Sequence, residues 1–120
     1  MARIFKSVIL MCTGSGIGPC LYALGHMPGT TVRLIWSAPS PRQIFGKRIY
    51  DAALRHDRKA IIWDTKKDGR RPDVVGLAED LYHETNAEAV WFISNRGLTR
   101  KVIAELRRRK VAAYALVFDA

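Results

Sequence analysis

One stretch of the sequence decides the fold: Val8-Ile9-Leu10-Met11-Cys12-Thr13-Gly14-Ser15-Gly16-Ile17-Gly18-Pro19. It starts as an apolar run typical of a buried strand and passes, through closely spaced glycines, into a segment that we expect to be helical from Ile17 onward. A pyrophosphate needs close approach to the backbone, which side chains at Gly14 and Gly16 would obstruct, and amide groups at a helix start stabilise it. Pro19 suits the first helical turn, where its missing N–H is not needed. The stretch therefore predicts a strand, a phosphate-binding loop and a helix.

A tight turn alone would also explain these glycines. Phosphate binding is favoured because the loop follows the first strand of the predicted sheet, where such folds bind ligands. Thr13 and Ser15 can add hydroxyl donors. The motif is neither G-x-x-x-x-G-K-[ST] nor the usual G-x-G-x-x-G, since Pro19 follows Gly18. A kinase-like loop and an ordinary Rossmann fingerprint are both disfavoured.

The rest of the chain alternates between strand-like and helix-like segments. Nearly continuous apolar runs, which predict strands covered on both faces, span residues 7–13, 31–37, 59–64, 89–94 and 111–118. Helical spacing covers residues 41–56, where Ser40 and Pro41 form the start signal, and residues 73–85. Thr99 can cap a last helix that ends near Lys110. The alternation predicts a doubly wound α/β fold with helices on both faces of five parallel strands in the order 3-2-1-4-5.

Length and composition indicate a single globular domain over residues 1–120, with 48% hydrophobic and 26% charged residues. No apolar run approaches the roughly 20 residues that span a bilayer, and the start does not resemble a signal peptide. We expect a cytoplasmic domain, whose parent protein could be membrane-associated.

Cys12 and Cys20 are expected to be reduced thiols in or near the core, and no metal site is expected. His26, His56 and His83 are predicted to be surface residues, and Trp36, Trp63 and Trp91 to be core residues rather than a base-stacking stripe.

The formal net charge is +9. The basic residues gather at 47–48, 66–71 and 107–110, and they would attract nucleic acid, an acidic protein or cofactor phosphates. A basic interaction domain or nucleic-acid-binding domain is therefore the alternative function. Nucleic acid is disfavoured because no recognised module is present and the clusters are dispersed.

The loop at residues 13–19 resembles the G-T-G-I-A/G-P loop in the C-terminal, nucleotide-binding lobe of the ferredoxin–NADP reductase superfamily. Residues 68–73 resemble that family's G-R-x-D element, and residues 113–120 look like its last strand. More narrowly, the chain resembles the reductase-like terminal module of certain membrane-anchored, adenylation-domain-containing proteins. The resemblance implies an NAD(P)H-binding domain that positions nicotinamide for hydride transfer to a flavin. Because the flavin lobe is absent, FAD or FMN would come from a partner domain or chain, and an acidic electron carrier is a further possible partner.

The resemblance also implies a set of cofactor-binding residues. Residues 14–19 would hold the pyrophosphate, Ser37 would flank the adenosine, and Thr65 with Lys66, near Arg70 or Arg71, would surround a 2′-phosphate. This favours NADP over NAD, whereas the carboxylate of Asp64 would suit the ribose diol of NAD. Ser94 stands where the family usually carries a cysteine beside the nicotinamide, so it could keep polar contact but lacks thiol chemistry. The full set is Thr13, Gly14, Ser15, Gly16, Ile17, Gly18, Pro19, Ser37, Asp64, Thr65, Lys66, Ser94 and Asn95.

Overall fold

The central strand of the sheet is β1 (Ser7–Thr13), the strand that leads into the glycine loop. The computed structural model describes residues 5–116. Five parallel strands lie in the order β3-β2-β1-β4-β5. The other strands are β2 (Thr31–Ala38), β3 (Ile61–Asp64), β4 (Ala89–Ile93) and β5 (Ala113–Ala115). The predicted fold class and strand order are confirmed.

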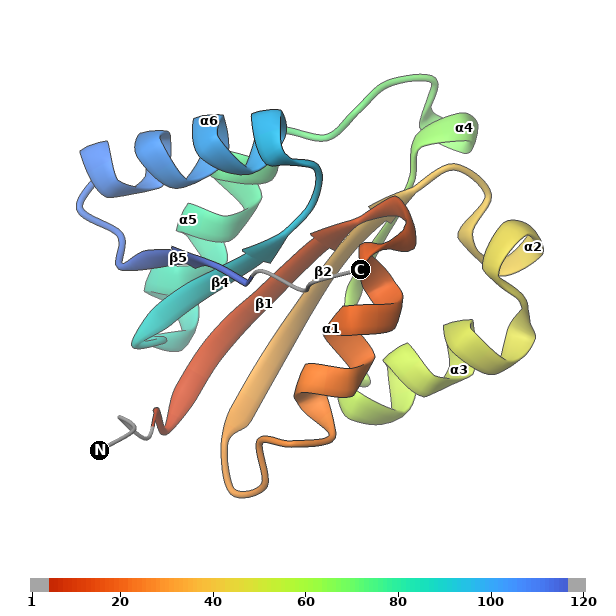
Figure 1. Cartoon of the computed structure of the whole chain (residues 1–120), viewed down its shortest axis with the longest axis horizontal. Coiled ribbons are helices and arrows are strands. Elements are labelled where there is room, and N and C mark those ends of the chain that lie inside the picture. Colours follow the sequence, from red (N-terminus) through yellow and green to blue (C-terminus); the bar gives the residue numbers. More distant parts are fainter. Residues whose placement is uncertain (1–4, 117–120) are drawn as a thin grey trace.

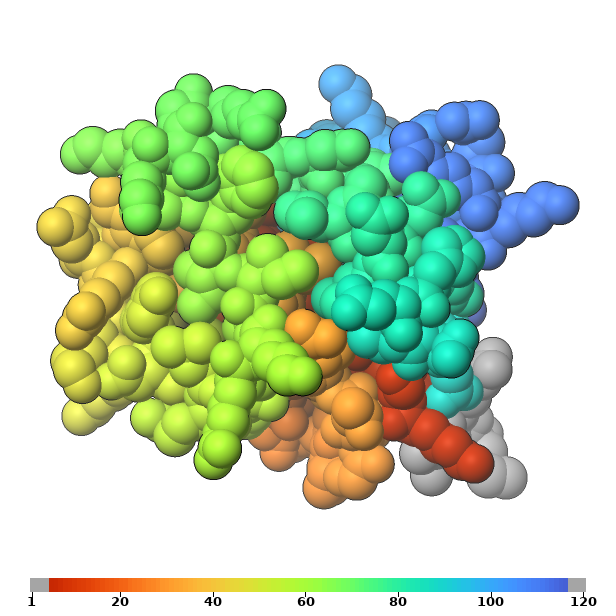
Figure 2. Space-filling view, turned by 180° about the vertical axis from the view of Figure 1, so that it is seen from behind, coloured from red at the N-terminus to blue at the C-terminus, as the bar shows by residue number. Residues whose placement is uncertain are grey.

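Helices cover both faces of the sheet. α1 (Ile17–Leu24) and α3 (Lys47–His56) lie in front of it in Figure 1, and α5 (Val74–Thr85) lies behind. α6 (Arg96–Arg108) packs on the same face as α5, through buried side chains that include Val102 and Leu106. In Figure 2, which shows the molecule from behind, the lime and green residues of β3 and α4 (Thr65–Asp68) adjoin the teal residues of α5.

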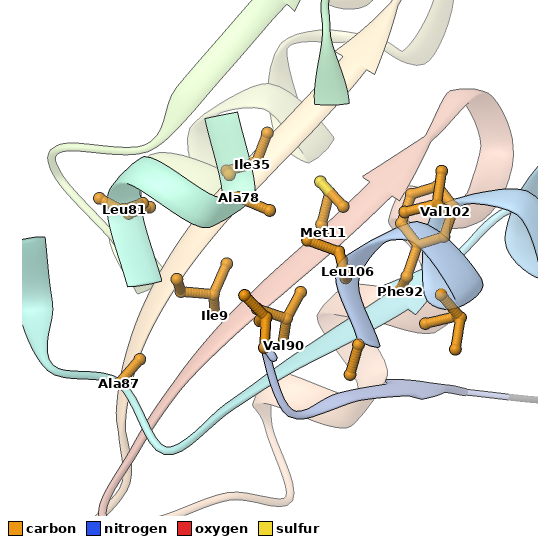
Figure 3. Close-up of a cluster of buried hydrophobic side chains, with 13 residues drawn as sticks. Ile9, Met11, Ile35, Ala78, Leu81, Ala87, Val90, Phe92, Val102 and Leu106 are labelled. Atoms are coloured by element: carbon orange, nitrogen blue, oxygen red, sulfur yellow. The ribbon is translucent and has the colours of Figure 1, made fainter. Parts of the chain in front are cut away.

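The core lies on both sides of β1, as expected for a strand with a continuous apolar run. Ile9 and Met11 point toward α5 and α6, while Leu10 and Cys12 point toward α1. All four side chains are fully buried. Figure 3 shows the cluster on the α5–α6 side, where residues of β1 and β4 meet those of the two helices. Burying each large side chain contributes about 1.5–3 kcal/mol, so this sheet holds the loop ends in fixed positions.

Several element boundaries differ from the prediction. The helix expected over residues 41–56 is divided into α2 (Pro41–Phe45) and α3, because Gly46 adopts a φ of 89° that interrupts helical geometry. Ser40 makes no side-chain capping bond. The last helix starts at Arg96 rather than near Thr99, because the side chain of Asn95 accepts a hydrogen bond from the amide of Leu98 at 2.9 Å.

The short elements at the end of the sheet also differ. β3 starts at Ile61 rather than Lys59, and a short helix, α4, follows it that was not predicted. β5 covers only Ala113–Ala115 of the expected run, of which residues 117 and 118 lie outside the described part. The sequence therefore located the strands better than their ends.

The cysteines and tryptophans largely lie where the sequence placed them. Cys12 and Cys20 are free and fully buried, and burial raises the pKa of the Cys12 thiol well above its usual range. Trp36 is fully buried, and Trp91 is partly buried and packs against the core. The prediction is wrong for Trp63, which lies outside both core clusters and has the guanidinium of Arg70 over its ring. Among residues 5–116 no helix is long and apolar enough to cross a bilayer.

Candidate functional site

The loop after β1 is a single 3-10 turn, Gly14–Gly16, that runs directly into α1. Gly14 has a φ of 53°, and a Cβ built on it would meet no atom within 4 Å. This backbone conformation disfavours L residues with side chains. Gly14 therefore presents a bare, open stretch of backbone next to the start of a helix, which is the geometry a phosphate group requires.

Gly16 has a different role. A Cβ at this position would lie 3.0 Å from the carbonyl oxygen of Ile93 and 3.2 Å from its Cγ2. The absence of a side chain lets the loop pack closely against β4. Close packing thus gives a reason for glycine at position 16, whereas Gly14 faces open space.

Two side chains fix the loop to the strands beside it. The indole Nε1 of Trp36 donates a hydrogen bond to the carbonyl of Gly14 at 3.1 Å. The hydroxyl groups of Thr13 and Ser94 form a hydrogen bond across the carboxyl ends of β1 and β4. Strand order reverses between these two strands, and open α/β sheets bind ligands at this point.

Two cavities flank the Thr13–Ser94 hydroxyl pair. The first, here named the central pocket, has a volume of about 350 Å³. It is lined by Thr13, Gly14, Ser37, Ala38, Pro39, Thr65, Arg71, Pro72, Val74, Asn95 and Leu98. The second, named the α6 groove, has a volume of about 650 Å³. It is lined by Pro19, Ile93, Ser94, Arg96, Thr99, Arg100, Ile103, Ala104, Arg107, Ala115 and Leu116. Thr13 lines the first and Ser94 the second, so the hydroxyl pair joins the walls of the two cavities.

The whole chain, residues 1–120, matches the family model described as "Adenylate-forming reductase 03009, C-terminal domain". The chain belongs to this family. It is 39% identical over 119 residues to "Adenylate-forming reductase 03009" of Coprinopsis cinerea and 38% identical over 119 residues to "Adenylate-forming reductase 06235" of the same fungus. These alignments cover 99% of this chain but only 11% of each relative. The expected resemblance to a reductase terminal module is therefore confirmed at the level of adenylate-forming reductases, and the wider superfamily assignment stays a prediction.

In this adenylate-forming reductase domain, the predicted site residues separate into three groups. The central pocket gathers Thr13, Gly14, Ser37, Thr65 and Asn95. The α6 groove gathers Pro19 and Ser94. Neither cavity is lined by Ser15, Gly16, Ile17, Gly18, Asp64 or Lys66. Most of the predicted polar residues at the strand ends thus converge, whereas Ile17, the first residue of α1, is buried and Ser15 and Gly18 lie on the surface.

Asp64 is occupied by the protein itself. Its Oδ1 accepts hydrogen bonds from the amides of Ser40 at 2.9 Å, Lys66 at 3.0 Å and Lys67 at 3.1 Å. These bonds, that of Ser40 above all, lower the pKa of the Asp64 carboxyl. Through its Oδ1, the carboxylate that the sequence suggested for a ribose diol caps α4 and links it to Ser40, just after β2.

Sequence reasoning missed the arginines on α6. Arg96, Arg100 and Arg107 all line the α6 groove, but the basic cluster singled out in the sequence was at residues 107–110. The spacing i, i+4 and i+11, which places residues on one helix face, was the signal that could have found them.

Proposed function

We propose that this domain binds a nicotinamide dinucleotide across the carboxyl ends of its strands and positions the nicotinamide for hydride transfer. The observation that carries the proposal is the open backbone at Gly14, at the start of α1 and beside the point where strand order reverses. The relatives' name, adenylate-forming reductase, supports a redox role. When bound, the dinucleotide would supply the hydride, while the protein contributes orientation and electrostatics.

Each part of the site has a task in this proposal. The loop at Gly14 holds the pyrophosphate, whose charge the amides at the start of α1 stabilise. The central pocket receives the adenosine half against Ser37 and Thr65. The nicotinamide lies toward Ser94, so the α6 groove is the space next to its reactive face. The hydride acceptor is a flavin held by another domain or chain, in keeping with the small share of the relatives' length that this chain spans.

NADP is the favoured form of the cofactor. A 2′-phosphate calls for charge-assisted donors, and Thr65 and Arg71 line the central pocket. The argument for NAD rested on Asp64, whose Oδ1 already accepts three backbone hydrogen bonds. We therefore assign 2′-phosphate recognition to Thr65 and Arg71 ahead of Lys66.

The test is calorimetric titration of the domain with NADPH, NADH and a short single-stranded oligonucleotide at two salt concentrations. Gly14→Val should weaken dinucleotide binding at least about tenfold, because it places a branched side chain in the open space over the loop and strains a positive-φ position by roughly 1–2 kcal/mol. Gly29→Val is the matched control. Gly29 also has a positive φ, of 81°, and open surroundings. It precedes β2 and therefore lies at the amino ends of the strands, away from the Gly14 loop at their carboxyl ends.

Two results would overturn the proposal. One is the absence of binding by either dinucleotide at millimolar concentration, and salt-sensitive oligonucleotide binding in that case would favour the alternative function. The other is equal loss of binding in the Gly14 and Gly29 variants, which would mean that general destabilisation rather than the loop is responsible.

A further inference from the structure

The α6 groove carries a row of positive charge for which residues 5–116 provide no ion-pair partner. Arg96, Arg100 and Arg107 lie at i, i+4 and i+11, so they share one face of α6 over a length of about 16 Å. No carboxylate is found among the described residues that line the groove. Three guanidinium groups along one wall are suited to an anion, because each offers several donors in a planar arrangement.

Elsewhere on the same helix the arginines are neutralised. Arg108 and Arg109 donate to the carboxylate of Glu105 at 2.6 and 3.0 Å, and Arg109 also pairs with Glu79 at 3.0 Å. The pKa of Glu105 is lowered to about 2 by these two arginines. Among the described ion pairs, none involves the three groove arginines, whereas Arg108 and Arg109 are both paired.

One of the groove arginines is also held in place. The Nε of Arg107 donates to the carbonyl of Ala113 at 3.0 Å, and its guanidinium lies over the ring of Tyr114 at 5.9 Å. A positioned guanidinium loses less conformational entropy when it binds a ligand than a mobile one does.

Between the arginines, much of the groove lining is apolar. Ile93, Ile103 and Leu116 supply aliphatic surface. The hydroxyl of Thr99, which also lines the groove, is buried and has no hydrogen-bond partner among the described residues. A buried hydroxyl without a partner is unfavourable, and this one belongs to a residue of the groove wall.

We infer that the α6 groove binds a small organic phosphate, with the apolar body of the molecule on Ile93 and Ile103 and the phosphate against Arg96, Arg100 and Arg107. Its volume is within the range of small-molecule sites, about 300–1,000 Å³. This inference concerns binding alone and does not depend on the proposed function.

Matched probe pairs test the inference without any dinucleotide. FMN and riboflavin share a flat aromatic body, and only FMN carries a phosphate. Octyl phosphate and octanol share an aliphatic chain, and only octyl phosphate carries a phosphate. In at least one pair the phosphate-bearing member should bind about tenfold more tightly, as expected for charge-assisted hydrogen bonds. The pair that shows the difference identifies the body as aromatic or aliphatic.

Two variants locate the phosphate. Arg100→Gln should remove most of the difference between the members of a pair. Lys101→Gln is the control, because it makes the same charge change on the same helix but does not line the groove. Binding should be measured by calorimetry, with thermal unfolding showing that both variants remain folded.

The inference is overturned if no probe binds, if phosphate-bearing and neutral members bind equally, or if Lys101→Gln costs as much as Arg100→Gln. Its failure is distinct from that of the proposed function. If the domain binds NADPH at the Gly14 loop but shows no phosphate preference in the groove, only the inference is overturned. If it shows the phosphate preference but does not bind NADPH, only the proposed function is overturned.

Discussion

Two aspartates frame the edge strand β3, one at each end. Before the strand, Asp57 accepts hydrogen bonds from the amide of Leu34 at 2.9 Å and from the Nε of Arg33 at 3.0 Å. After the strand, Asp64 accepts from the amide of Ser40 at 2.9 Å and from two amides of α4. Each carboxylate therefore ties the β3 end of the sheet to β2 or to the residues that follow it.

The two aspartates differ in their position relative to the predicted binding edge, and therefore in the function that the sequence suggested for them. Asp57 is 8% exposed and sits in a loop far from the predicted binding edge, so it suggested no function. Asp64 ends a strand at the binding edge, where a carboxylate is typical of a ribose contact. Their hydrogen bonds show the same structural task. A carboxylate at a strand end can thus serve to hold the fold together, as Asp64 does through its Oδ1.

The largest effect should come from removing the buried member of the pair. Asp57→Ala should lower the free energy of unfolding by about 3 kcal/mol, because it leaves Arg33 and a buried amide of β2 without their acceptor. Urea denaturation of the domain measures this loss. A loss no greater than that of Asp64→Ala would contradict the ranking of the two aspartates.

The strands could be predicted because each is a local apolar run, and their arrangement could be predicted because helices alternate with them along the chain. Continuous apolar residues at 7–13 and 89–94 indicate strands covered on both faces, and alternation with helices determines a parallel sheet. The break at Gly46 was visible as a glycine, but the apolar spacing continues across it. Helical periodicity alone therefore merged α2 and α3.

Only part of the site could be predicted, because some of its contacts join segments that are far apart in the sequence. The open loop at Gly14 follows from a short motif, but the partner of Asp64 is Ser40, 24 residues away, and depends on how β2 and β3 are aligned. The close contact of Gly16 with Ile93 likewise joins segments that only the folded sheet brings together. A single sequence carries no direct signal for either contact.

If Asp64 has only a structural role, selectivity between the two dinucleotides should depend on cations in the central pocket. On the proposed function, Arg71→Gln should weaken NADPH binding about tenfold, since a charge-assisted contact to the 2′-phosphate is lost. NADH binding should change little. Parallel calorimetric titrations give both constants.

The control for this experiment is Lys66→Gln, because Lys66 is exposed and lines neither cavity. It removes the same charge close to the same turn. A greater loss of NADPH binding in Lys66→Gln than in Arg71→Gln would restore the assignment first suggested by the sequence.

The smallest effect concerns the charge of Asp64 and appears in the pH dependence of stability. Hydrogen bonds from the amides of Ser40, Lys67 and Lys66 lower the pKa of this carboxyl in the folded state, below an unfolded value of about 3.9. A group with a lowered folded pKa contributes stability that is fully present above the unfolded pKa and is lost as the pH falls through the folded pKa.

Asp64→Asn keeps an acceptor oxygen of similar shape and removes the charge. Wild type should therefore be more stable than this variant from pH 7 to about pH 5, and the gap should narrow below about pH 4. Urea midpoints measured for both proteins at each pH cancel the contributions of other carboxyls, Glu105 included. A gap that is constant down to pH 2 would mean that the ionised form of Asp64 is not what holds Ser40 and α4 together.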